Sequence, residues 1–153
     1  MTKVYLFAIL EIEKARGGVY IEWKQKVKMV YADSTKQEIL AKIHQTVQDG
    51  TLGSEYTIIN REKNRRLRKD YIVNDEKIRE ILLDLKITDF DKQEMSKNEE
   101  HPEDVVYVFR KKHLLMPRYQ EDADYKSVSL YIKVTWPEDG ALMLIISLHE
   151  IGV

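Results

Sequence analysis

The chain has 153 residues, of which 33% are charged and 43% are hydrophobic, and its formal net charge at pH 7 is −1. This length predicts one domain with a core of its own, and the balanced charge does not by itself indicate a nucleic-acid partner. The absence of cysteine excludes disulfides, thiolate zinc sites and thiol catalysis. No apolar run approaches the roughly 18 residues of a membrane span, so we expect a soluble, cytoplasmic protein without a membrane partner.

The first expected element is a long β-hairpin within residues 1–32. Apolar and polar side chains alternate on both sides of a Gly-Gly turn signal at 17–18. One face of this hairpin is rich in lysine, which indicates contact with water or protection against edge-to-edge aggregation. The sequence thus predicts a single domain over 1–153, made of a hairpin extension over 1–32 and a core over 33–153.

Two helices are expected next, with short strands between them. Apolar residues recur at helical spacing over 34–48, and again after Asn74 and Asp75, which are good N-cap residues. EYTIIN at 55–60 predicts a strand, and 70–73 is a candidate for another. Between these two strands lies a segment rich in basic residues, at 61–69.

That segment, REKNRRLRK at 61–69, contains six bases and one acid and is predicted to be a basic loop. A local basic loop indicates an anionic partner, although a solvated surface loop explains the same composition equally well.

Polar residues without periodicity predict a loop over 91–103. Three strands are then expected to close the chain, over 104–111, 127–136 and 141–150. Strands joined by turns, with helices between some of them, predict an α+β fold with an antiparallel sheet.

The absence of known catalytic and binding motifs argues against several enzyme classes. The chain has no glycine-rich phosphate-binding motif, and its four histidines lack the spacing of metal ligands. We therefore expect no metal and no other cofactor.

The C-terminal hairpin combines apolar residues with Tyr131 and Lys133 on one strand and Ser147 and His149 on the other. Side chains alternate along a strand, so each pair shares one face of its own strand. A four-residue turn puts the two pairs on opposite faces, whereas a five-residue turn brings them together. The sequence leaves both registers open, and an amphipathic hairpin with one wet face is the simpler interpretation.

Four strings in the C-terminal half resemble a known family: DLKITDF at 84–90, DVVYVFRK at 104–111, SLYIKVTW at 129–136 and LIISLHE at 144–150. They are similar to the MqsR-type toxins, small ribonucleases of the RelE-like superfamily of bacterial toxin–antitoxin systems. The resemblance covers about residues 34–153. It implies a twisted antiparallel sheet with two helices packed on one side, metal-independent cleavage of single-stranded mRNA, and neutralisation by an antitoxin protein.

The resemblance also implies three catalytic residues. The family's active-site tyrosine falls on Tyr131, its C-terminal lysine on His149, and its lysine after the Asp-Phe pair on Lys92. The histidine at 149 departs from the family pattern, and 1–32 has no counterpart in the short toxins. Arg110 and Lys111 are the nearest candidates for one further polar residue.

This chemistry needs a base for the 2′-OH, an acid for the leaving oxygen and cations for the phosphate. The residues expected to bind RNA are Lys133, Arg110, Lys111, Arg61, Arg65, Arg66 and Arg68. Two other functions stay open. One is an inhibitor from a phage or other mobile element that acts on a nucleoprotein complex such as a CRISPR effector. The other is a non-catalytic RNA- or protein-binding domain. The expected partners are single-stranded RNA and an antitoxin or other protein, and the oligomeric state is left open.

Overall fold

The computed structural model describes residues 33–153, so the hairpin predicted over 1–32 lies outside the described residues. The chain divides into two compact units, Met1–Ile39 and Leu40–Val153. Helix α3 (Asp33–Asp49) begins in the first unit and ends in the second. The second unit contains every strand of the described sheet and the candidate site. The division into a 1–32 extension and a 33–153 core stays a prediction.

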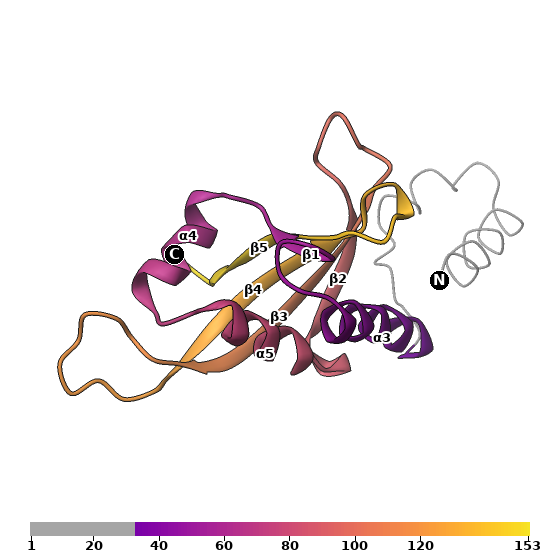
Figure 1. Ribbon diagram of the computed structural model, residues 1–153. Helices are drawn as coiled ribbons and strands as arrows, with labels where there is room; N and C mark the ends of the chain where they lie inside the picture. Colours follow the sequence, from indigo (N-terminus) through magenta and orange to yellow (C-terminus); the bar gives the residue numbers. More distant parts are fainter. Residues whose placement is uncertain (1–32) are drawn as a thin grey trace, which may run out of the picture. The chain divides into compact units, whose positions relative to one another are not determined.

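The second unit is an α+β fold built on one five-stranded sheet (Figure 1). The strand order is β1-β5-β4-β3-β2. The antiparallel strands β2 to β5 follow one another in space as in sequence, whereas β1 runs parallel to β5 at the far edge. The sheet is therefore mixed, not wholly antiparallel as expected. The strand bounds are β1 (Tyr56–Ile58), β2 (Phe90–Met95), β3 (Val105–Leu115), β4 (Lys126–Thr135) and β5 (Met143–Glu150).

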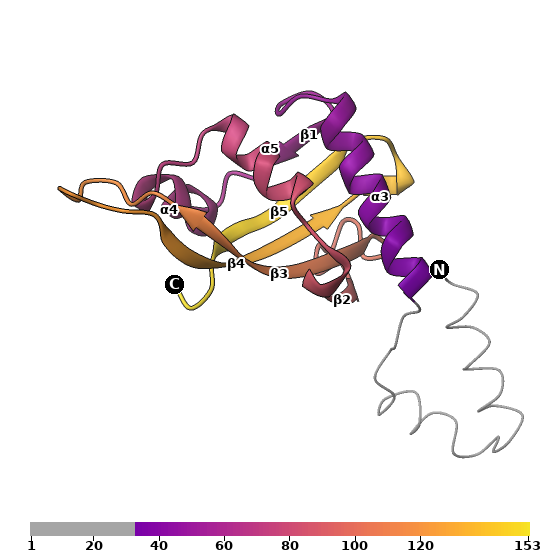
Figure 2. The same cartoon turned by 90° about the horizontal axis from the view of Figure 1, so that it is seen from below.

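Helices pack on one face of this sheet (Figure 2). Helix α5 (Asp75–Leu83) starts at the predicted cap, where the Asn74 side chain accepts a hydrogen bond from the Lys77 backbone N–H at 2.8 Å. Its apolar stripe buries Ile78, Ile81 and Leu82. In α3, Ile43 and Val47 are fully buried, and the Arg79 guanidinium of α5 donates to the Val47 carbonyl.

Alternation along the strands separates the two faces of the sheet. The helix-covered face carries the buried core residues, which include Phe109, Leu130, Ile132, Val134, Ile145 and Leu148. The other face, called the polar face below, carries Glu94, Arg110, Tyr131, Lys133, Ser147 and His149. The helices thus pack on the apolar face, whereas the other face combines these polar residues with the buried Val106 and Val108.

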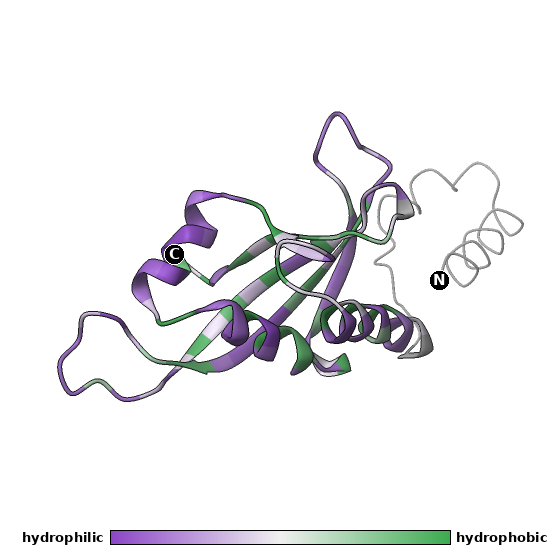
Figure 3. Cartoon of the chain, viewed as in Figure 1, coloured by the Kyte–Doolittle hydropathy of each residue, from purple (hydrophilic) through white to green (hydrophobic). Residues whose placement is uncertain are grey.

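The segment predicted as a basic loop is a helix, α4 (Glu62–Asp70). Only Asn64 and Leu67 are buried in it, and Figure 3 shows hydrophilic colours over most of its length. Two buried residues three positions apart lie on one helix face, which is enough to attach the helix to the sheet edge. So few apolar residues leave little periodicity in the sequence.

Two further predictions were wrong. Residues 70–73 form no strand, and Tyr71 makes only an isolated bridge with Pro117. Part of the predicted loop 91–103 belongs to β2, which pairs with β3. Because β2 is the edge strand of the described sheet, its charged side chains keep contact with water and hide the apolar alternation. Over residues 33–153, no helix is long and apolar enough to cross a membrane.

Candidate functional site

The last hairpin brings Tyr131, Lys133, Ser147 and His149 to one face of the sheet. Tyr131 lies opposite His149, and Lys133 lies opposite Ser147. Neither predicted turn gives this register. Near the turn Thr135 lies opposite Leu144, and that register alone would put His149 on the helix-covered face.

A β-bulge in β5 shifts its register against β4 by one residue. Val134 lies opposite Ile145 while Lys133 lies opposite Ser147, so Ile146 is the extra residue. The bulge therefore decides that Ser147 and His149 reach the polar face.

Asn64 of α4 holds the bulge in place. Its side-chain amide donates to the Ile146 carbonyl at 3.0 Å, and its side-chain oxygen accepts from the Leu148 backbone N–H at 2.9 Å. A third bond, at 2.9 Å, goes to the Ile59 carbonyl. The last backbone bond from the β1 side ends at Ile145, so the Asn64 side chain continues the edge pairing where the backbone leaves it.

The rings of Tyr131 and His149 are adjacent, with centroids 5.4 Å apart and planes inclined by 30°. His149 Nδ1 lies 3.0 Å from the Glu150 carbonyl oxygen. A carbonyl oxygen can only accept, so Nδ1 carries the hydrogen, and in the neutral ring the lone pair is on Nε2. This tautomer follows from the hydrogen bond, and it presents His149 as a proton acceptor.

Two cations lie near the Tyr131 ring, one opposite it on β3 and one two residues further along β4. The Arg110 guanidinium lies 5.2 Å from the ring centroid, and Lys133 Nζ lies 5.9 Å from it. Each cation also has a carboxylate: Arg110 pairs with Asp91 at 3.2 Å and Lys133 with Glu94 at 2.7 Å. The site is thus a network of charges in which the aromatic pair lies beside paired cations.

Lys92 is linked to this network through Glu94, whose second oxygen lies 3.4 Å from Lys92 Nζ. Burial raises the pKa of Glu94, but hydrogen bonds from Lys133 and then Lys92 outweigh burial and hold that pKa below its ordinary value. Glu94 therefore stays ionised at neutral pH and balances part of the positive charge.

Helix α4 supplies further cations beyond the edge of β5. Arg61, which precedes the helix, donates to Ser147 Oγ at 3.4 Å. Lys63 and Arg66 line a small pocket together with His149. The basic segment therefore borders the His149 end of the site.

Three predicted RNA-binding residues are separated from Tyr131 and His149. Lys111 points to the helix-covered face, where its ammonium lies 2.6 Å from Asp84 and its side chain is 4% exposed. Arg65 and Arg68 bond Asn60 and Asp75, at 2.8 and 3.2 Å, and line a cavity on the other side of α4. Neighbouring strand residues face opposite ways, so Arg110 and Lys111 cannot both join the site.

Two residues of the site were not predicted, Asn64 and Glu94. A helical interpretation of 61–69 would have placed Asn64 and Leu67 on one inward face, which was the available signal for Asn64. Glu94 lies in a segment predicted as a loop, and nothing local indicated that it would pair with Lys133.

No cluster of three histidine, aspartate or glutamate side chains within residues 33–153 is arranged to hold a metal ion. Comparisons of the chain with protein-family models, with curated proteins and with solved structures found no match. Function is therefore inferred from the geometry of the site and from the motif resemblance.

Proposed function

We propose that the protein is an endoribonuclease that cleaves single-stranded RNA by attack of the 2′-OH, without a metal, and that it acts as the toxin of a toxin–antitoxin pair. The observation that carries the proposal is the pairing of Tyr131 with His149 across β4 and β5. This pair lies on the polar face with cations on two sides, which is the equipment that metal-free RNA cleavage requires.

In the proposed reaction, His149 Nε2 takes the proton of the 2′-OH, and the 2′-oxygen forms a bond to the adjacent phosphorus. The bond from phosphorus to the 5′-oxygen breaks, and the Tyr131 hydroxyl protonates that oxygen. The products are a 2′,3′-cyclic phosphate and a 5′-hydroxyl end. Lys133 and Arg110 stabilise the negative charge that builds on the phosphoryl oxygens. Only RNA has the attacking hydroxyl.

Helix α4 supports the proposal as a guide for the RNA strand. The bases Arg61, Lys63 and Arg66 are exposed and lie at the His149 end of the site. Exposed cations attract phosphates without regard to base sequence, and this attraction weakens with salt.

The test is incubation of the purified chain with single-stranded RNA in EDTA. We expect cleavage that persists in EDTA and is lost in His149→Ala and strongly reduced in Tyr131→Phe. His101→Ala is the matched control, because His101 lies in the loop between β2 and β3. Intact RNA with the unmodified protein, or full cleavage by His149→Ala, would overturn the proposal.

A second candidate is a non-catalytic RNA- or protein-binding domain, including an inhibitor from a mobile element that acts on a nucleoprotein complex. The observation that favours it is that Lys133 and Arg110 already pair with Glu94 and Asp91, which reduces the charge available to a transition state. RNA binding that is retained without any cleavage would favour this candidate over the nuclease.

A further inference from the structure

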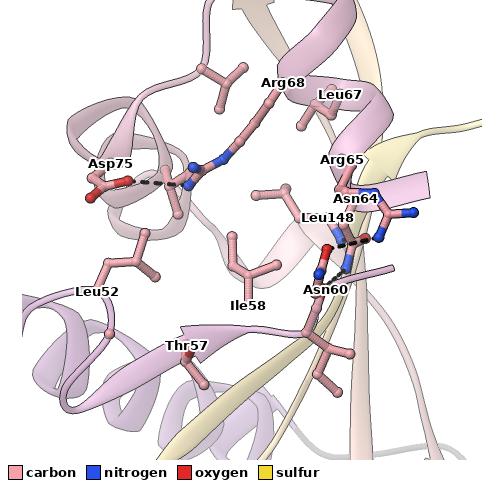
Figure 4. Close-up of a pocket in the computed structure, with 14 residues that line it drawn as sticks. Leu52, Thr57, Ile58, Asn60, Asn64, Arg65, Leu67, Arg68, Asp75 and Leu148 are labelled. Carbon is pink, nitrogen blue, oxygen red and sulfur yellow. Dashed lines mark hydrogen bonds and ion pairs between the residues drawn. The ribbon is translucent and has the colours of Figure 1, made fainter. Parts of the chain in front are cut away.

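A cavity of about 290 Å³ lies on the opposite side of α4 from His149, between α4, α5 and the outer edge of β1. Aliphatic side chains dominate its lining: Leu52, Ile58, Leu67, Val73, Ile78 and Leu148. Figure 4 shows Arg68 paired with Asp75 at its rim and Arg65 beside Asn60. The site therefore combines an apolar interior with a charged rim.

The cavity opens beside the outer edge of β1, where Gly53 N–H already bonds the Tyr56 carbonyl at 2.7 Å but, among the described residues, the Ile58 position remains for another strand. Within the described sheet β1 is an edge strand. The Met143 N–H bonds the Glu55 carbonyl at 3.1 Å, and the Ile59 N–H bonds the Ile145 carbonyl at 3.0 Å. In a parallel ladder every second residue of a strand bonds the neighbour, so the N–H and C=O of Ile58 point outward. A segment that pairs with Ile58 would direct a side chain into the cavity.

The rim favours a negatively charged partner. Arg65 and Arg68 are exposed, and the ion pair from Arg68 to Asp75 has both side chains substantially in water, at 44% and 71% exposure. Such a pair contributes little to stability. A carboxylate from a partner can therefore replace Asp75 on Arg68 at small cost.

The lining does not suit a nucleobase. Proteins that bind unpaired bases stack them on aromatic rings, and none of the residues that line this cavity is aromatic. We infer that the cavity and the β1 edge together dock an extended segment of a partner protein, with an aliphatic side chain in the cavity and acidic residues beside it on Arg65 and Arg68. This inference does not depend on RNA cleavage.

The test is selection of random peptides of about twelve residues, displayed in a library, on the full-length protein. We expect enriched sequences with an aliphatic residue next to Asp or Glu. Leu52→Asp puts a negative charge at the cavity and should weaken binding of a selected peptide by about tenfold or more. Leu142→Asp is the matched control, because Leu142 is 43% exposed in the connection between β4 and β5.

Three results would overturn the inference. One is the absence of enriched acidic and aliphatic sequences, and another is equal binding by Leu52→Asp and Leu142→Asp. The third is displacement of the selected peptide by single-stranded RNA together with loss of RNA binding in Leu52→Asp, which would assign the cavity to RNA. RNA cleavage by the unmodified protein is measured in parallel, so that failure of the docking site and failure of the nuclease are seen separately.

Discussion

Replacement of Asn64 by alanine should destabilise the protein and disable the site together. The change removes the side-chain hydrogen bonds to the Ile59 and Ile146 carbonyls and to the Leu148 N–H. Asn64 is 7% exposed, so these groups lose buried partners. An unsatisfied buried group costs about 1–3 kcal/mol, and because water at the sheet edge replaces part of the loss, we expect about 2–4 kcal/mol in total.

For a chain of this size about 2–4 kcal/mol lowers Tm by about 5–15 °C, which thermal unfolding followed by circular dichroism measures. Cleavage activity should fall by more than the loss of folded protein explains. Without Asn64 the bulge can relax, so that β5 slips by one residue and His149 turns to the helix-covered face. At a temperature where the variant is folded, we expect kcat for RNA cleavage to drop about a hundredfold, equivalent to about 2.7 kcal/mol, with a smaller change in KM.

Asn60→Ala is the matched control, because Asn60 is exposed and its side-chain oxygen accepts a hydrogen bond from the Arg65 side chain at the surface, at 2.8 Å. It should leave Tm within about 2 °C, as surface substitutions usually do. The reasoning is refuted if Asn64→Ala melts as the unmodified protein does, or if the folded variant keeps its full kcat.

Three further predictions concern charge. Glu94→Gln removes the carboxylate that two lysines share, so single-stranded RNA should bind about three- to tenfold more tightly, with a steeper salt dependence in a filter-binding titration; weaker binding would show that Glu94 serves the RNA. Arg66→Glu should weaken RNA binding about tenfold and Arg65→Glu less, because only Arg66 lies on the His149 side of α4; equal losses would contradict this placement. The Lys111 hydrogen bond holds the pKa of Asp84 below its ordinary value, so the stability it provides is present above about pH 4 and is lost as pH falls through the lower folded pKa. Urea midpoints should therefore fall less on acidification in Lys111→Met than in the unmodified chain, and parallel losses would oppose the assignment.

Local patterns in the sequence were sufficient for the elements with strong periodicity. The strands β3, β4 and β5 and the helix that starts after Asn74 lie close to their expected positions, because alternation and capping are properties of neighbouring residues. Helix α4 and strand β2 were missed since at least half of the side chains in each are charged, and because the contacts that fix them involve residues distant in the sequence.

The register of the last hairpin could not be predicted from the sequence for a different reason. Both expected turns assumed a regular ladder, whereas Ile146 is inserted in a bulge and Asn64, which is 82 positions away, bonds its carbonyl. Tyr131 and His149 do share a face, but through a long-range contact that turn length could not indicate. The sequence therefore identified Tyr131 and His149 as candidates, but only the folded structure shows the bulge that brings them to one face.

The measurement that tests the proposed nuclease most directly is the chemistry of the RNA ends after incubation of the unmodified protein with single-stranded RNA in EDTA. We expect 2′,3′-cyclic phosphate and 5′-hydroxyl ends, with no cleavage at a position where the 2′-OH is replaced by hydrogen. Ends with a 5′-phosphate and a 3′-hydroxyl, or cleavage at the 2′-deoxy position, would contradict it.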